Sequence, residues 1–200
     1  MMRLPIVPTI VVVAAAGIMV WLGVWQIHRY HYKNDLVVRF ERNSRLPPVA
    51  WPAVPPTDDA LLYRHATGYC LQPVGWREIV GRNMKDEPGW SHTASCRVGA
   101  EGPGMEVDVG WSTEPHPPQW RGGPVTGLIV PDRLHGIRLV AANAAPGLVP
   151  TQPPSPRDMP NNSLFYAIQW FCFAVLALVI YLLALRRRRR DKVATAPPAP

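Results

Sequence analysis

Two long apolar runs decide the fold: LPIVPTIVVVAAAGIMVWLGVW at residues 4–25 and LFYAIQWFCFAVLALVIYLLAL at residues 164–185. Neither run contains Asp, Glu, Lys or Arg. As a helix, each run reaches roughly 33 Å, slightly more than the ~30 Å hydrocarbon core of a bilayer. Both runs are therefore predicted to cross a membrane, with the first transmembrane helix at 4–27 and the second at 161–185.

A cleaved signal peptide is the alternative interpretation of the first run. Ala14-Ala15-Ala16-Gly17 offers the small residues that signal peptidase accepts. The apolar run continues well past these residues to Trp25, which favours a retained helix. In that interpretation, the Ala/Gly patch lets another helix approach closely.

The net charge of +7 is concentrated at one end of the chain. Residues 26–163 contain 14 Lys/Arg and 13 Asp/Glu, so the excess lies in the tail after the second span. An arginine block directly after a span is typical of an anchor at the anionic cytoplasmic surface, and nucleic-acid binding is not favoured. The block consists of Arg186, Arg187, Arg188, Arg189 and Arg190.

This block predicts that both termini are cytoplasmic, because two spans bring both ends of a chain to one side of the membrane. Residues 26–163 would then lie outside, in a periplasm or its organellar equivalent. The basic residues that follow the first span argue for the reverse orientation when that span is considered alone. They are Arg29, Lys33, Arg39 and Arg42.

The segment between the spans predicts a small β domain. Helix is expected to extend from the first span to about residue 40, followed by a Pro-rich linker at 41–62. Short apolar runs separated by turn residues then predict a β-rich domain at 63–142, a second Pro-rich linker at 143–160 and, after the second span, a basic tail at 186–200. The expected strands are 63–71, 76–82, 92–98, 105–111, 123–130 and 137–142.

The fold class expected from these segments is α+β. It combines a two-helix transmembrane hairpin with a small, mainly antiparallel extracytoplasmic β domain, whose sheet is curved or barrel-like. Cys70 and Cys96 both lie in this domain, where an oxidising compartment would permit a disulfide. From their positions alone we expect two unpaired, half-buried thiols, and no metal site, because no His or Asp accompanies them in a metal-binding pattern.

Catalytic motifs are not evident in the sequence. It contains no Gly-x-Ser-x-Gly, no His-Glu-x-x-His, no Gly-x-x-x-x-Gly-Lys and no Cys-x-x-Cys. We therefore predict that the protein is not an enzyme.

Polar and aromatic residues gather instead where the two spans meet the outer surface. The first span ends in Trp25-Gln26-Ile27-His28-Arg29, and Tyr166, Gln169 and Trp170 share one face at the start of the second. An ordinary interfacial belt of Trp and Tyr with a snorkelling Arg is one interpretation. The other is a binding site for an amphipathic ligand that carries carboxylates, such as haem, because a guanidinium beside aromatic walls and amides would hold it.

These two stretches resemble the signatures of a known family. Leu22-Gly23-Val24-Trp25-Gln26-Ile27-His28-Arg29 resembles the first-span signature of the Surfeit-locus-1 family of cytochrome c oxidase assembly proteins. Asn161-Asn162-Ser163-Leu164-Phe165-Tyr166-Ala167-Ile168-Gln169-Trp170-Phe171 resembles the second-span signature. Between them, Asp108-Val109-Gly110-Trp111 stands where the family usually has Asn-Arg-Gly-Trp.

The resemblance implies an assembly factor of the bacterial inner membrane that receives haem a and helps to mature the large catalytic subunit of an aa3-type oxidase. Its implied partners are that subunit, the haem a synthesis machinery and membrane lipid. The residues implied to form the functional surface between the spans are Trp25, Gln26, Arg29, Asn162, Tyr166, Gln169 and Trp170.

Two departures from the family pattern affect these expectations. Ser163 stands where the family often has a histidine proposed as a haem ligand, and serine is a poor ligand for iron. His28, in the first-span motif, is the substitute candidate. The missing histidine and Val109 in the middle motif motivate an alternative, a membrane-anchored module that recognises another envelope protein or lipid without haem.

Overall fold

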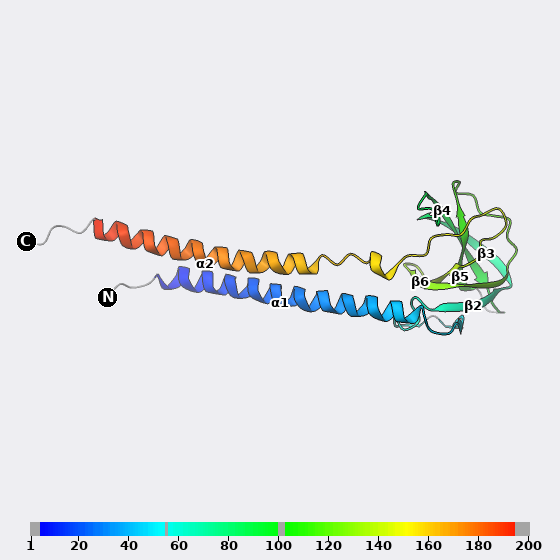
Figure 1. Cartoon of the computed structure of the whole chain (residues 1–200), viewed down its shortest axis with the longest axis horizontal. Coiled ribbons are helices and arrows are strands. Elements are labelled where there is room, and N and C mark those ends of the chain that lie inside the picture. The colour runs from blue at the N-terminus through cyan, green and yellow to red at the C-terminus, as the bar shows by residue number, and fades with distance from the viewer. Residues whose placement is uncertain (1–4, 55, 100–102, 195–200) are drawn as a thin grey trace, which may run out of the picture. The chain divides into compact units, whose positions relative to one another are not determined.

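The computed structural model describes residues 5–54, 56–99 and 103–194, and the chain forms two compact units (Figure 1). The helical unit contains the chain up to Asp35 and from Pro160 onward. The β unit comprises Leu36–Met159 and is wider than the 63–142 domain expected from the sequence. Residues 195–200 of the predicted tail lie outside the described residues.

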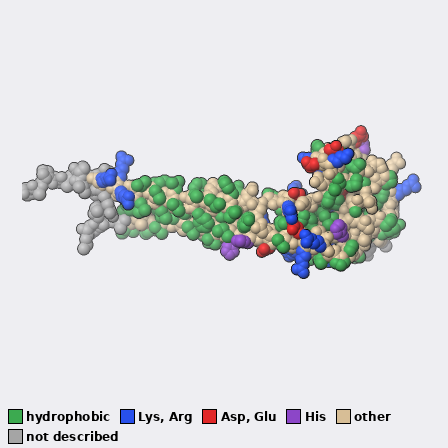
Figure 2. All heavy atoms as spheres, in the orientation of Figure 1, with side chains coloured by type: hydrophobic (Ala, Val, Ile, Leu, Met, Phe, Trp, Pro, Cys, Tyr) green, Lys and Arg blue, Asp and Glu red, His purple; other side chains and the backbone are tan. Residues whose placement is uncertain are grey.

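The helical unit consists of parts of α1 (Ile6–Asn43) and α2 (Ser163–Ala194), each long and apolar enough to cross a membrane. α1 extends beyond the predicted span to Asn43, close to the expected helix end near residue 40, and α2 continues through the arginine block beyond the predicted span boundary at residue 185. Most side chains of the apolar stretches are exposed, as Figure 2 shows by the hydrophobic side chains along the helices. A lipid environment would cover such surfaces.

The two helices run antiparallel within this unit. Thr9 hydrogen-bonds Tyr181 through their hydroxyls, and Asn161 Nδ2 donates to Tyr30 O. Between these contacts, a Cβ added to Gly23 would lie 2.7 Å from the Phe171 ring. The glycine therefore permits the helices to approach where an aromatic side chain crosses between them.

A seven-stranded mixed sheet makes up the β unit, with the order β1-β2-β6-β7-β5-β4-β3. Four neighbouring pairs are antiparallel, whereas β1–β2 and β5–β7 are parallel. All six predicted strands are present, with an additional short strand, β1, in the segment predicted as a Pro-rich linker. The bounds are β1 Val49–Ala50, β2 His65–Cys70, β3 Gln72–Arg82, β4 Pro88–Arg97, β5 Pro103–Ser112, β6 Gly123–Asp132 and β7 Gly136–Ala141.

The core of the β unit lies on one face of this sheet. Val107, Leu139 and Ile129 are fully buried and occupy facing positions on β5, β7 and β6. The last turns of α1 contribute Phe40, whose ring centroid lies 4.9 Å from that of Tyr63. α1 thus serves both units, because its apolar start belongs to the helical unit and its end packs in the β core.

Cys70 and Cys96 form a disulfide in this core, so the prediction of two unpaired thiols is wrong. Both cysteines are fully buried, with their Cα atoms 5.2 Å apart. They lie at the ends of β2 and β4, which are not neighbours in the sheet. These ends nevertheless meet, because Leu71 N donates to Arg97 O beside the disulfide. The chain passes from β2 through Leu71 into β3, and the start of β3 pairs with the end of β4, so this pairing sets the proximity, which spacing in the sequence does not reveal.

Candidate functional site

The site residues predicted on α1 lie along its surface near the C-terminal end of the apolar run. Trp25 is 45% exposed, and the Arg29 guanidinium lies over its ring, 5.4 Å from the centroid. His28 is exposed and Gln26 is half-buried. The exposed cation, indole and imidazole are accessible to a second molecule, and the cation–π contact orients the guanidinium.

On α2, the predicted polar residues face away from the packed side of the helix. Asn162, Tyr166 and Gln169 are exposed, whereas Trp170 is half-buried. The buried positions hold small residues at helical spacing: Ser163, Ala167 and Ala174. The amide of Gln169 is therefore accessible to lipid or to another protein, and an amide within a span favours a protein partner.

Three hydrogen bonds that the sequence analysis did not predict join α1 to the residues just before α2. Asn161 Nδ2 donates to Asn34 Oδ1 at 3.0 Å and to Tyr30 O at 3.3 Å. Lys33 Nζ donates to Pro160 O at 2.6 Å. Asn34 lies one helical turn after Tyr30, so the sequence shows that both are on one face of α1. Which residue contacts that face depends on the antiparallel register of the helices, which the sequence does not show.

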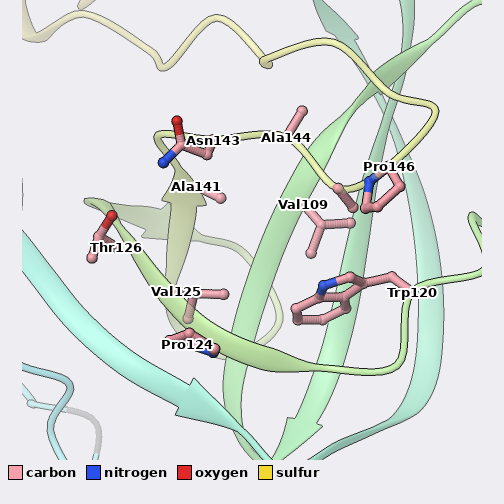
Figure 3. Close-up of a pocket in the computed structure, with 10 residues that line it drawn as sticks. Val109, Trp120, Pro124, Val125, Thr126, Ala141, Asn143, Ala144 and Pro146 are labelled. Atoms are coloured by element: carbon pink, nitrogen blue, oxygen red, sulfur yellow. The ribbon is translucent and has the colours of Figure 1, made fainter.

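A pocket of about 340 Å³ lies in the β unit (Figure 3). Buried residues of the sheet and of the following loop form part of its lining: Val109, Val125, Ala141 and Ala145. The Trp120 indole flanks this lining, and Thr126 and Asn143 contribute exposed polar side chains.

None of the ten described lining residues is charged. Val109 occupies the position at which the resembled family usually has arginine, and its apolar side chain lines the pocket. The lining combines apolar side chains with the uncharged polar groups of Thr126 and Asn143, and the pocket has the size of a small-molecule site.

Asp108, the residue before Val109 in the sequence, has a buried carboxyl group. Asp108 is fully buried on β5 and accepts hydrogen bonds from the hydroxyls of Ser91 and Thr151, the latter at 2.7 Å, and from Gly110 N. Burial raises the pKa of Asp108 above its ordinary value, and these hydrogen bonds and the charge of Arg138 offset only part of that effect. Complete burial makes it a structural group rather than a site open to a substrate.

Replacing Asp108 by Asn is expected to stabilise the protein at pH 7.5 and to lose that advantage near pH 4. A raised pKa means that the folded state holds the proton more tightly, so stability falls as the pH rises from 3.8 towards the folded pKa. The neutral amide avoids this loss, and both hydroxyls can still bond to it. We expect a gain of about 1–3 kcal/mol at pH 7.5, measured by thermal unfolding of the full chain in detergent at both pH values.

The Asp132→Asn variant provides the control of opposite sign. Burial alone would raise the pKa of Asp132, but hydrogen bonds from Arg77, His135 N and Leu134 N, together with the Arg77 charge, hold it below its ordinary value. This carboxylate therefore stabilises the fold above that ordinary value, and the stabilisation is lost as the pH falls. Asp132→Asn should be less stable at pH 7.5. If Asp108→Asn raised the stability equally at both pH values, the raised pKa of Asp108 in the folded state would be contradicted.

Charged side chains cluster around Asp132 in the β unit. Arg77 lies 3.0 Å from Asp132 and 3.6 Å from Glu106, and His135 lies 3.5 Å from Asp132. Within residues 5–54, 56–99 and 103–194, no group of three or more His, Cys, Asp or Glu side chains is arranged to hold a metal ion. The contacts of Arg77, Asp132, Glu106 and His135 form an ion-pair network on the sheet.

Two apolar helices of membrane-spanning length, joined to a disulfide-linked β unit, indicate a membrane protein. The chain belongs to the SURF1 family, whose model matches residues 13–175 and so includes parts of both helices and all of the sheet. This family is known for cytochrome c oxidase assembly and is not a family of catalytic enzymes. No curated protein matches the chain.

Proposed function

We propose that this chain is an assembly factor for an aa3-type haem–copper oxidase and assists haem a insertion or maturation of the large catalytic subunit. The family match over residues 13–175 carries this proposal. The exposed side chains of Arg29, Tyr166 and Gln169 support it, because an assembly factor needs accessible contacts at the membrane surface. The large catalytic subunit and the haem a synthesis machinery are the proposed partners.

The proposed location is the bacterial inner membrane, with both termini in the cytoplasm and the β unit in the periplasm. Two independent features support this topology. The arginine block Arg186–Arg190 favours the cytoplasmic side. The Cys70–Cys96 disulfide favours an oxidising compartment for the β unit.

Haem a is proposed as a transient cargo rather than a resident cofactor. Arg29 is an exposed cation for a haem carboxylate, and the adjacent Trp25 ring offers an apolar face. His28 is the candidate iron ligand, because its imidazole is exposed near these groups, whereas Ser163 is buried.

Deletion of the gene in a bacterium that makes an aa3-type oxidase is expected to lower the assembled oxidase and its haem a absorbance. The wild-type chain should restore both, and an Arg29→Leu/Gln169→Leu variant should not, provided that immunoblots show equal amounts in the membrane. Leu176→Ala, another exposed position on α2, is the matched control that should restore the oxidase. Unchanged oxidase in the deletion strain would exclude the proposed role.

The haem step has its own readout. The chain purified from haem a-producing cells should show a haem a absorption band that the His28→Ala variant lacks. A protein without haem that still supports oxidase assembly would exclude the cargo role and leave maturation of the subunit.

A membrane-anchored binding module without haem is the second candidate function, and the uncharged pocket beside Trp120 favours it. A pocket without a cation is poorly suited to haem carboxylates. In this case, the deletion strain would keep its oxidase, and Ala145→Phe, which fills the pocket, would abolish co-purification of the bound envelope component.

A further inference from the structure

Strand β3 forms one edge of the sheet and is bonded to β4 alone among the strands. It is one of the longest strands, with 11 residues, and the Val80 side chain is 74% exposed. Long exposed edges are normally shortened, charged or covered, because their free N–H and C=O groups attract other strands. The structure permits us to identify which groups of β3 are free.

The register with β4 assigns the backbone groups of β3. Asn83 N donates to Glu87 O, so Asn83 and Glu87 form a hydrogen-bonded pair where β3 leads into the turn before β4. Such pairs alternate along an antiparallel ladder, and the register is uninterrupted from Trp76 to Arg82. The N–H and C=O groups of Trp76, Glu78, Val80 and Arg82 therefore point away from β4.

The segment before α2 confirms that these backbone groups point away from β4, and it pairs with one of the four residues, Arg82. Gln152 N donates to Arg82 O from the outer side of β3. Pro153 and Pro154 follow and have no N–H to continue the pairing. No described residue forms a backbone hydrogen bond with the outward groups of Trp76, Glu78 or Val80.

The charged side chains of β3 determine which kind of strand can pair with this open edge. Arg77 is paired with Asp132 and Arg82 with Asp86, but Glu78 makes no ion pair with any described residue. Suppose that the β3 edges of two copies paired antiparallel over the three free positions, with Trp76 of one copy opposite Val80 of the other. Glu78 would then lie opposite Glu78 of the other copy. Like charges directly opposite each other are destabilising, whereas a cation there is favourable.

We propose that the outer edge of β3 from Trp76 to Val80 binds an extended segment of another protein by strand addition, with a basic residue opposite Glu78. The backbone ladder supplies the affinity, and Glu78 and Val80 supply the specificity, as in other complexes formed by β-augmentation. This site is separate from the helix ends of the proposed function and does not depend on it. A second copy of this chain is disfavoured by Glu78.

The probe is a fluorescein-labelled acetylated peptide, Val-Thr-Lys-Thr-Val, titrated by fluorescence anisotropy against the full chain in lipid nanodiscs. In antiparallel register, its lysine lies opposite Glu78 and its valines opposite Trp76 and Val80. Replacing the lysine by glutamate should weaken binding by about two- to thirtyfold. The Glu78→Lys variant should reverse this preference between the two peptides.

The backbone ladder is tested with two isomeric peptides, so that the result does not depend on the folding of a variant. N-methylation of the lysine and the last valine removes N–H groups that face β3 and should abolish binding. N-methylation of both threonines removes N–H groups that face away and should leave most of the binding. Equal binding by the two isomers would overturn strand addition.

On the protein, Val80→Pro and Val80→Ala form the matched pair. Proline removes the outward N–H of residue 80 without removing a bond to β4, so binding should weaken at least about tenfold. Alanine keeps that N–H and should bind within about threefold of wild type. No binding of the lysine peptide, or self-association of the chain that Val80→Pro abolishes, would overturn the proposal.

Discussion

Replacing Cys70 and Cys96 together by alanine is expected to lower the free energy of unfolding of the β unit by about 3.5 kcal/mol. The two residues are 26 positions apart, and cross-linking a loop of that length removes much of the conformational freedom of the unfolded chain. Both side chains are also buried in the core, so the variant loses packing as well. Thermal unfolding of the full chain in detergent, with and without a reductant, measures the effect.

Two controls separate the disulfide from general effects. Cys172→Ala removes the free cysteine on α2 and should leave the unfolding transition of the β unit unchanged. The reductant should destabilise wild type but not the double variant. If the double variant unfolds at the wild-type temperature, the disulfide does not stabilise the unit.

The same bond reports the compartment of the β unit in cells. When cells are lysed with a thiol-alkylating reagent that adds mass, wild type should be labelled at Cys172 and remain unlabelled at Cys70 and Cys96 until reduction. A bacterial cytoplasm would keep both thiols reduced. Labelling of all three cysteines without reduction would contradict the proposed periplasmic location.

The helices and strands were largely predictable, because each depends on local patterns. The apolar runs before Trp25 and after Leu164 indicated both helices from length and composition. The strands followed from short apolar runs between turn residues, and only β1 was missed, since two residues carry too little pattern. α2 continues through the arginine block beyond the span predicted to end at residue 185, because membrane thickness limits the length of a span but not the length of a helix.

The contacts between distant segments were not predictable in the same way. The Cys70–Cys96 bond depends on the pairing of β3 with β4, and the pocket joins Trp120 to residues 141 and 143–146. Spacing showed that Tyr166 and Gln169 share a helix face, but not which face packs. The small residues Ser163, Ala167 and Ala174 were the signal for the packed face, since bulky side chains cannot lie where helices approach closely.

Replacing Gly127 by alanine is expected to prevent normal folding of the β unit, or to lower its free energy of unfolding by about 3 kcal/mol or more. A Cβ at Gly127 would lie 2.0 Å from Val140 O, which is a backbone atom of the neighbouring strand β7. Side chains can rotate away from such a clash, but this carbonyl is part of the β6–β7 ladder. The strands would have to separate beside Val125 and Ala141, which line the pocket.

Gly75→Ala is the matched control on β3, because its added Cβ would meet Ser95 Cβ at an ordinary 3.7 Å. The two variants carry the same chemical change in strands of one sheet, so a difference in their unfolding temperatures isolates the close approach of β6 and β7. Equal unfolding temperatures would show that β7 moves freely. The small residue at position 127 would then have no role in shaping the pocket, whereas a large difference assigns that role to the tight β6–β7 pair.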